Sequence, residues 1–276
     1  MDLYSVETYL QPTSLTEVSD WQPDWHWLAG GTWIFNERNP QIKVLVDMQQ
    51  LDWAAIAVTS DGLSIGAACI QNDLLEFSFP PSWHATDALK DAVRELASFK
   101  LSHAATVGGN ICLALSASTF IPAMIALDAQ YEIWRPGYDP YFVDAADFQT
   151  APQQTVLQPG EVLCNIKIPC SSLTPWRTNF KRMAVCTAGY AIAIVVTAYH
   201  PQTQQVRFGV GGSLQSPQLI EFDAIPTVEQ IAASFQGLTF LHDERGSAAY
   251  RQHITQVLMQ RGIAELASET EGPRRY

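Results

Sequence analysis

The stretch ATVGGNICLALSAST, residues 105–119, places two glycines and an asparagine directly behind the β-branched pair Thr106-Val107 and ends in a hydroxyl-rich segment. A second Gly-Gly pair lies near the N-terminus in LAGGT, residues 28–32. Glycine allows positive φ and lets another molecule approach the backbone closely, because it has no Cβ. Successive exposed N–H groups then form a concave nest that suits an anion such as a diphosphate.

The two glycine pairs predict loops, and their interpretation has two alternatives. A lone Gly-Gly is most often a tight turn. Neither pair fits the spacing of G-x-G-x-x-G or of G-x-x-x-x-G-K-S/T, which argues against a Rossmann fold and a P-loop. A dinucleotide cradle is the functional alternative to the plain turn, and the residues alone leave both open.

The composition indicates a sizeable core and an acidic surface. The chain has 276 residues, of which 47% are hydrophobic and 16% charged, and its net charge is −12. This charge argues against a nucleic-acid partner, because such proteins gather Lys and Arg on one face. The cysteines are scattered and form no C-x-x-C pair, which argues against a zinc or iron–sulfur site in this chain; they are Cys69, Cys112, Cys164, Cys170 and Cys186.

We expect a cytoplasmic protein with no membrane span. The longest nearly unbroken apolar run, residues 188–199, is shorter than the ~20 residues that a membrane span requires. The N-terminal MDLYSVETYL, residues 1–10, lacks the apolar region of a signal peptide.

Alternating strand and helix patterns predict an α+β fold with an N-terminal ligand-binding domain over residues 1–170 and a C-terminal sheet-and-helix domain over 171–276. The first divides into subdomains at about 1–54 and 55–170. Ser60-Asp61-Gly62 predicts a hairpin turn. In the helix that follows Thr86, the apolar face holds Leu89, Val93, Leu96 and Ala97. Strands are expected at 42–46, 55–59, 63–67, 130–134, 162–168, 190–198 and 206–210, and helices at 86–100, 122–129, 228–235 and 247–267.

Several segments in the same order resemble the FAD-binding (medium) subunit of the molybdenum hydroxylases, the carbon monoxide dehydrogenase and xanthine dehydrogenase type. The pair AGGT…TVGGN, with about seventy residues between its members, is the first resemblance. The others are LQPGEVLCNIKIP (157–169), NFKR (179–182), VRFGVGGSLQSPQLIE (206–221) and RGSAAYR (245–251). Together they cover nearly the whole chain.

The resemblance implies a two-part FAD-binding domain in which both glycine segments lie against the FAD diphosphate. Leu163 then packs near the isoalloxazine ring, and Lys181 and Tyr190 lie near the flavin. The walls of the site would be Ala29, Gly30, Gly31, Thr32 and Trp33 on one side and Thr106, Val107, Gly108, Gly109 and Asn110 on the other.

Each of these residues also has a simpler interpretation. Leu163 and Tyr190 could be ordinary strand packing, and a lysine such as Lys181 is usually a solvated surface charge. Trp21, Trp25, Trp27 and Trp33 surround the first glycine pair, and packing or a protein interface explains them more simply than a cofactor does.

Four departures from the family pattern bear on FAD binding. Thr119 stands where the family has an aspartate that meets FAD hydroxyls, and a neutral hydroxyl makes a weaker hydrogen bond than a carboxylate. Gly189 replaces the aspartate of a "D-Y-A" turn. Trp33 follows Gly31-Thr32 where the family has "G-T-D", and residues 101–103 replace "I-R-N".

The resemblance implies an electron-transfer role with no catalytic residue in this chain. The family oxidises its substrate at a molybdenum cofactor on a large partner subunit and passes electrons through [2Fe-2S] clusters on a small one to FAD. A heterotrimer, doubled by symmetry, is the expected assembly. The alternative is a flavin-poor structural or small-ligand subunit that kept the fold. A self-sufficient flavin oxidase is disfavoured because no substrate domain is left over.

Overall fold

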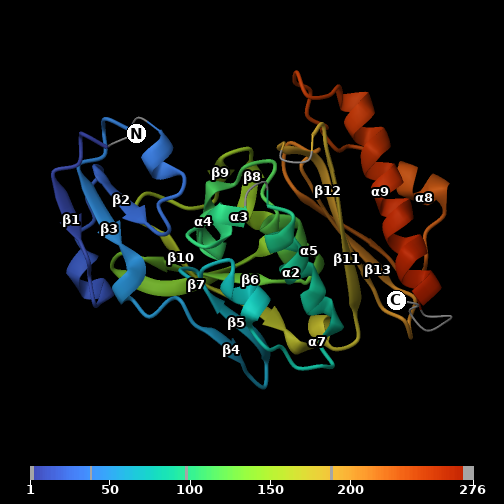
Figure 1. Cartoon of the computed structure of the whole chain (residues 1–276), viewed down its shortest axis with the longest axis horizontal. Helices are drawn as coiled ribbons and strands as arrows, with labels where there is room; N and C mark the ends of the chain where they lie inside the picture. The colour runs from blue at the N-terminus through green and yellow to red at the C-terminus, as the bar shows by residue number, and fades with distance from the viewer. Residues whose placement is uncertain (1–2, 38, 97–98, 187–188, 270–276) are drawn as a thin grey trace.

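The computed structural model describes residues 3–37, 39–96, 99–186 and 189–269. Figure 1 shows the order of the layers. A small N-terminal sheet lies beside a central sheet, helices α2 and α5 separate the central sheet from a C-terminal sheet, and α9 covers the far side of the latter. The predicted α+β fold is confirmed.

The N-terminal part is a parallel three-stranded sheet in the order β1-β3-β2. The first glycine segment directly follows β2, so the sheet fixes where that segment begins. Its strands are β1 (Thr8–Leu10), β2 (Trp25–Leu28) and β3 (Val44–Asp47), and its short 3-10 turns are Leu15–Val18, Ile34–Asn36 and Met48–Gln50.

The central sheet is antiparallel throughout, in the order β4-β5-β10-β6-β7. The β4–β5 hairpin predicted at residues 60–62 is present. A β-bulge interrupts the β10–β6 pairing between Leu163 and Asn165. The strands are β4 (Ile56–Val58), β5 (Gly62–Gly66), β6 (Gln130–Arg135), β7 (Tyr138–Asp144) and β10 (Val162–Pro169), beside the short pair β8 (Gln149–Ala151) and β9 (Gln154–Thr155).

Helices fill the space between the central and C-terminal sheets. The second glycine segment begins α4, which packs against β10. The helices of this part are α1 (Asp73–Glu76), α2 (Asp87–Arg94), α3 (Phe99–Ser102), α4 (Val107–Leu113), α5 (Phe120–Ala126), α6 (Ala145–Phe148) and α7 (Cys170–Leu173), with a 3-10 turn at His84–Thr86.

The C-terminal part is an antiparallel sheet in the order β11-β12-β13-β14. One face packs on α2 and α5, and the other carries α9. Its elements are β11 (Arg177–Ala184), β12 (Ala191–Tyr199), β13 (Val206–Gly211), β14 (Gln218–Phe222), α8 (Val228–Ala233) and α9 (Ala248–Glu269).

One hydrophobic core crosses the boundary expected at residue 170. It joins Leu63 and Ile166 of the central sheet and Met124 of α5 to Phe180 and Ile194 of the C-terminal sheet. A separate core lies between that sheet and α8 and α9. The division into domains at 170 therefore remains a prediction.

Three expected elements differ from those observed. The helix expected to reach residue 100 ends at Arg94, and Ala97 lies outside the described residues. Pro122 is the third residue of α5 rather than its first. The loop expected at the second glycine pair is wrong, because Thr106 caps a helix that already contains both glycines. In the described part of the chain, no helix has the length and hydrophobicity needed to cross a membrane.

Candidate functional site

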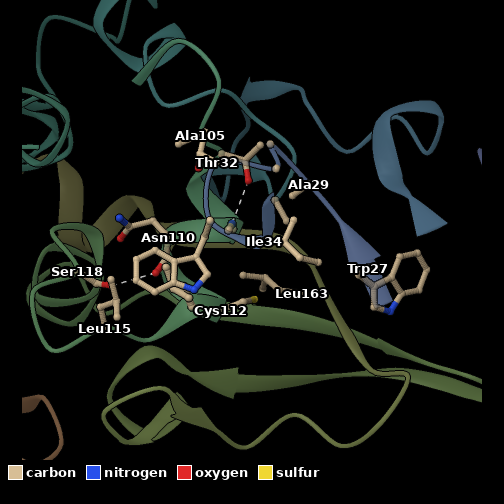
Figure 2. Close-up of a pocket in the computed structure, with 18 of the residues that line it drawn as sticks. Trp27, Ala29, Thr32, Ile34, Ala105, Asn110, Cys112, Leu115, Ser118 and Leu163 are labelled. Atoms are coloured by element: carbon tan, nitrogen blue, oxygen red, sulfur yellow. Dashed lines mark hydrogen bonds between the residues drawn. The ribbon is translucent and has the colours of Figure 1, made fainter. Parts of the chain in front are cut away.

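Both glycine segments line one cavity of about 820 Å³. Its walls come from the segment after β2, from α4 and the chain after it, from β10, and from the turn before β12 (Figure 2). Twelve of the fourteen residues expected to bind FAD line it: Ala29, Gly30, Gly31, Thr32, Trp33, Thr106, Gly108, Gly109, Asn110, Thr119, Leu163 and Tyr190. Val107 and Lys181 are not among the lining residues.

The first glycine segment presents a run of free backbone donors. Within the described residues, the N–H groups of Gly30, Gly31, Thr32 and Trp33 donate to no protein acceptor. Gly31 has a φ of +69°, a conformation that L side chains rarely adopt. These residues are partly exposed along the cavity. The segment therefore has the free, adjacent N–H groups of an anion nest.

The second glycine segment differs, because its donors are already used within the protein. The N–H of Val107 donates to the Cys69 carbonyl and that of Gly108 to the Ala67 carbonyl, both at 2.9 Å. The N–H of Gly109 donates to the Thr106 Oγ1 at 3.0 Å, which caps α4. An N-terminal helical turn normally leaves such groups without partners. Here the turn forms a wall whose N–H groups are satisfied.

Gly108 is required by the packing of the protein on itself. A Cβ at this position would lie 2.6 Å from the Ala67 Cβ and 2.7 Å from the Ala67 carbonyl oxygen. Gly30 is similar, since its Cβ would lie 2.0 Å from the Ala104 carbonyl oxygen. Close approach of a ligand is therefore not what excludes a side chain at these two glycines.

The hydroxyl-rich end of the second segment returns to α4. Ser118 Oγ donates to the Asn110 carbonyl at 3.0 Å, and the Phe120 N–H donates to Asn110 Oδ1 at 3.4 Å. Thr119 is only 3% exposed, and its Oγ1 has no hydrogen-bond partner among the described residues. A buried hydroxyl without a partner carries a free-energy cost, which a bound ligand would remove.

The bulge in β10 lies beside the cavity and contributes to its apolar wall. Leu163, which precedes the extra residue Cys164, lines the cavity and is 1% exposed. Cys112 of α4 lies beside it (Figure 2). Bulges of this kind redirect a strand next to a binding site. The result is an apolar wall of Leu163, Cys112 and Val162.

Arg182, rather than Lys181, faces the cavity. Successive side chains of a strand point to opposite faces, so Lys181 of β11 pairs with Glu265 of α9. Arg182 shares the face of Phe180, lines the cavity, donates to the Gly189 carbonyl and lies 3.9 Å from Glu95. The sequence signal that identifies Arg182 is its spacing in NFKR: it lies two residues after the apolar Phe180, on the same face of the strand.

Sequence reasoning also missed Gln71. This residue is 1% exposed, lines the cavity and donates through Nε2 to the Thr106 carbonyl at 3.0 Å. Its Oε1 has no partner in the described part of the chain. Only the fold brings it to the second glycine segment, so no local sequence pattern reveals it.

The tryptophans near the first glycine pair pack on one another. Trp21 and Trp27 stack with ring centroids 4.7 Å apart, and Trp25 and Trp134 meet them edge-on. Trp27 Nε1 donates to the Gly160 carbonyl at 3.2 Å. The rings thus join β2 to the central sheet and to the segment before β10, which bounds the cavity on that side.

Residues 4–171 of the chain match the family described as the FAD-binding domain in molybdopterin dehydrogenase. The chain belongs to this FAD-binding family. It is 28% identical to a xanthine dehydrogenase of Oryza sativa subsp. japonica over 52% of this chain and 11% of that protein. It is 25% identical to the nicotine 6-hydroxylase medium subunit of Paenarthrobacter nicotinovorans over 65% of this chain and 66% of that one. The match spans only 11–16% of the length of the xanthine dehydrogenases.

Solved structures share the fold of nearly the whole chain, including the part that follows the matched residues 4–171. Reconstituted CO dehydrogenase from Oligotropha carboxidovorans matches with a TM-score of 0.85 and 21% identity, covering 97% of this chain and 99% of that one. Quinoline 2-oxidoreductase from Pseudomonas putida 86 matches with a TM-score of 0.82 and 21% identity, covering 99% and 100%. The C-terminal sheet and α9 are thus part of a shared architecture.

The thiol of Cys112, which lines the cavity, should be unreactive at neutral pH. Burial raises the pKa of Cys69, Cys112 and Cys164 to about 12, whereas Cys186 is exposed. Because thiolate forms only as the pH approaches the pKa, a disulfide reagent at pH 8 should modify Cys186 rapidly and leave Cys69, Cys112 and Cys164 intact. Mass spectrometry of the labelled chain measures this, with Cys186→Ser as the control that removes the fast reaction. Labelling of Cys112 as fast as Cys186 would contradict it.

Proposed function

We propose that this chain is the FAD-binding electron-transfer subunit of a molybdenum hydroxylase. A large partner subunit would hold the molybdenum cofactor and a small partner subunit the [2Fe-2S] clusters, in a heterotrimer or a dimer of heterotrimers. Electrons would pass through the clusters to FAD in this chain and then to a terminal acceptor. The observation that carries the proposal is one cavity, in a chain of this family, that joins both glycine segments.

The residues present fit a long anionic dinucleotide. The cavity of about 820 Å³ falls within the roughly 300–1,000 Å³ of small-molecule and cofactor sites. The free N–H groups of residues 30–33 suit a diphosphate, and the buried Thr119 hydroxyl suits a polar chain next to it. Trp33, at the end of this N–H run, adds an aromatic wall.

Bound FAD supplies the redox chemistry, while the protein supplies binding, orientation and electrostatics. The N–H groups of residues 30–33 would donate to diphosphate oxygens. Leu163 and Cys112 would exclude water from one face of the flavin, and Tyr190 would border it at the rim. Arg182 would place a guanidinium at the Tyr190 end of the cavity, where Glu95 lies 3.9 Å from it.

The alternative is a flavin-poor structural or small-ligand subunit, motivated by the neutral Thr119 and Gly189 at positions where the family has aspartates. Flavin content decides between the two, since the purified assembly should release FAD when it is denatured. A cytoplasmic location, which five unpaired thiols support, is part of the leading proposal.

Gly31→Ala should weaken FAD binding by about tenfold, because it disturbs the positive φ on which the nest depends. Gly137→Ala is the matched control, since Gly137 also has a positive φ, of +75°, but lies outside the cavity with open space around its Cβ position. The positive φ should cost about 1 kcal/mol of folding free energy in each variant. Gly31→Ala also requires the Phe35 ring to shift, because a Cβ at Gly31 would lie 2.5 Å from Phe35 Cε2. Fluorescence titration of the flavin-free protein with FAD measures the difference. Equal FAD affinity in the two variants would contradict the nest.

Thr119→Val should have opposite effects on folding and on binding. Replacing a buried hydroxyl that has no partner should raise the stability of the flavin-free protein by up to about 1 kcal/mol, while FAD affinity falls roughly threefold to tenfold. Thr197→Val is the control, because Thr197 Oγ1 is also buried without a partner in the described chain but does not line the cavity. Urea unfolding and FAD titration measure the two effects. Weakened FAD binding in Thr197→Val, or unchanged binding in Thr119→Val, would be evidence against a hydroxyl contact.

A further inference from the structure

The strands β12 and β13 separate just where the chain reaches the cavity. Their pairing ends at Ile194 and Gly211. On the other side of β12, Ile192 is the extra residue of a bulge in the pairing with β11. The residues immediately before it, 189–191, line the cavity. This end of β12 therefore lacks the regular ladder that would hold a cavity wall in place.

Arg251 of α9 supplies the missing connection. Its Nη1 donates to the Ile192 carbonyl and to the Gly212 carbonyl, each at 2.8 Å. Ile192 and Gly212 are the residues at which the two strands have parted, so one guanidinium replaces the next rung of the sheet. Arg251 is 1% exposed. Burying a guanidinium costs free energy unless all its hydrogen-bond partners are in place. The loss of any one partner should therefore destabilise the whole Arg251 arrangement.

Asp243 completes the set of partners and leads back to the cavity. It accepts from Arg251 Nη2 at 2.6 Å and pairs with Arg245 at 3.0 Å. Burial alone would raise the pKa of the Asp243 carboxyl, but the hydrogen bonds from Arg251 and from the Arg245 backbone, with both charges, lower it overall. The Arg245 guanidinium lies 5.8 Å from the centre of the Tyr190 ring. The network thus holds the backbone at Ile192, next to the wall, and reaches the wall itself at the Tyr190 ring.

We propose that Arg251, oriented by Asp243, is a positioning residue that holds residues 189–191 as the wall of the isoalloxazine end of the cavity. This inference rests on the proposed function, because it takes Tyr190 and Leu163 to border the flavin ring. Arg251 does not line the cavity. Its effect would pass through the backbone of β12, so it would act on the flavin half of FAD and leave the diphosphate half unaffected.

The test compares two ligands that share the adenosine diphosphate half. FAD and ADP are titrated into the flavin-free complex carrying wild-type, Arg251→Lys or Arg251→Met chains. Arg251→Met should weaken FAD on the order of tenfold, since a mobile wall must be ordered on binding, and should change ADP affinity less than twofold. Arg251→Lys should restore part of the FAD affinity, because an ammonium still donates to the two carbonyls. Arg207→Met is the matched control, as Arg207 lies on β13 and pairs with Glu221 away from the cavity.

Hydrogen exchange of the same proteins gives a readout that does not depend on activity or on flavin. Amides of residues 189–192 should exchange faster in Arg251→Met than in wild type and Arg207→Met. Asp243→Asn keeps an acceptor for Arg251 and serves if Arg251→Met does not fold, with the same FAD-selective weakening expected.

Equal weakening of FAD and ADP, or none, would overturn the positioning role. If the wild-type complex binds neither ligand, the proposed function itself fails, and that outcome is distinct from the first.

Discussion

The site depends on one constraint: every N–H group in the first turn of α4 donates a hydrogen bond to an acceptor within the protein. Val107, Gly108 and Gly109 donate to Cys69, Ala67 and Thr106, so this turn is fastened to the chain that follows β5. It serves as a fixed wall against which the rest of the cavity is built. The run of free donors lies in residues 30–33, which pack beside the second glycine segment and line the same cavity. The two similar glycine pairs therefore have different physical roles.

The remaining walls are held by contacts between distant parts of the chain. The tryptophan cluster ties β2 to the central sheet, and the bulge at Cys164 turns Leu163 toward the cavity. The Arg251 network holds the turn before β12. In an acidic chain, Arg182 supplies the one guanidinium among the described residues that line the cavity. Because Glu37, Glu95 and Glu161 also line the cavity, the free N–H groups, rather than an excess of positive side chains, prepare it for an anionic ligand.

Local patterns predicted the elements well where a single residue type decides the structure. The hairpin at residues 60–62 follows from turn chemistry. The helix that starts after Thr86 follows from its apolar spacing, since the Thr86 side chain makes no capping hydrogen bond. The helical state of residues 107–113 was missed because adjacent glycines disfavour a helix, whereas tertiary hydrogen bonds to Ala67 and Cys69 stabilise it. Gln71 was missed because only the folded chain brings it to the cavity, and Arg251 because only the folded chain brings it to the end of β12 behind the cavity wall. Lys181 was chosen over Arg182 because the resemblance did not take strand parity into account.

Hydrogen exchange of the two glycine segments with and without FAD tests the central claim most directly. The account predicts that the amides of residues 30–33 exchange rapidly in the flavin-free protein and become protected when FAD binds. The amides of residues 107–109 should already be protected and should change little, because their hydrogen bonds are intramolecular. FAD-induced protection at residues 107–109 with none at residues 30–33 would contradict the account.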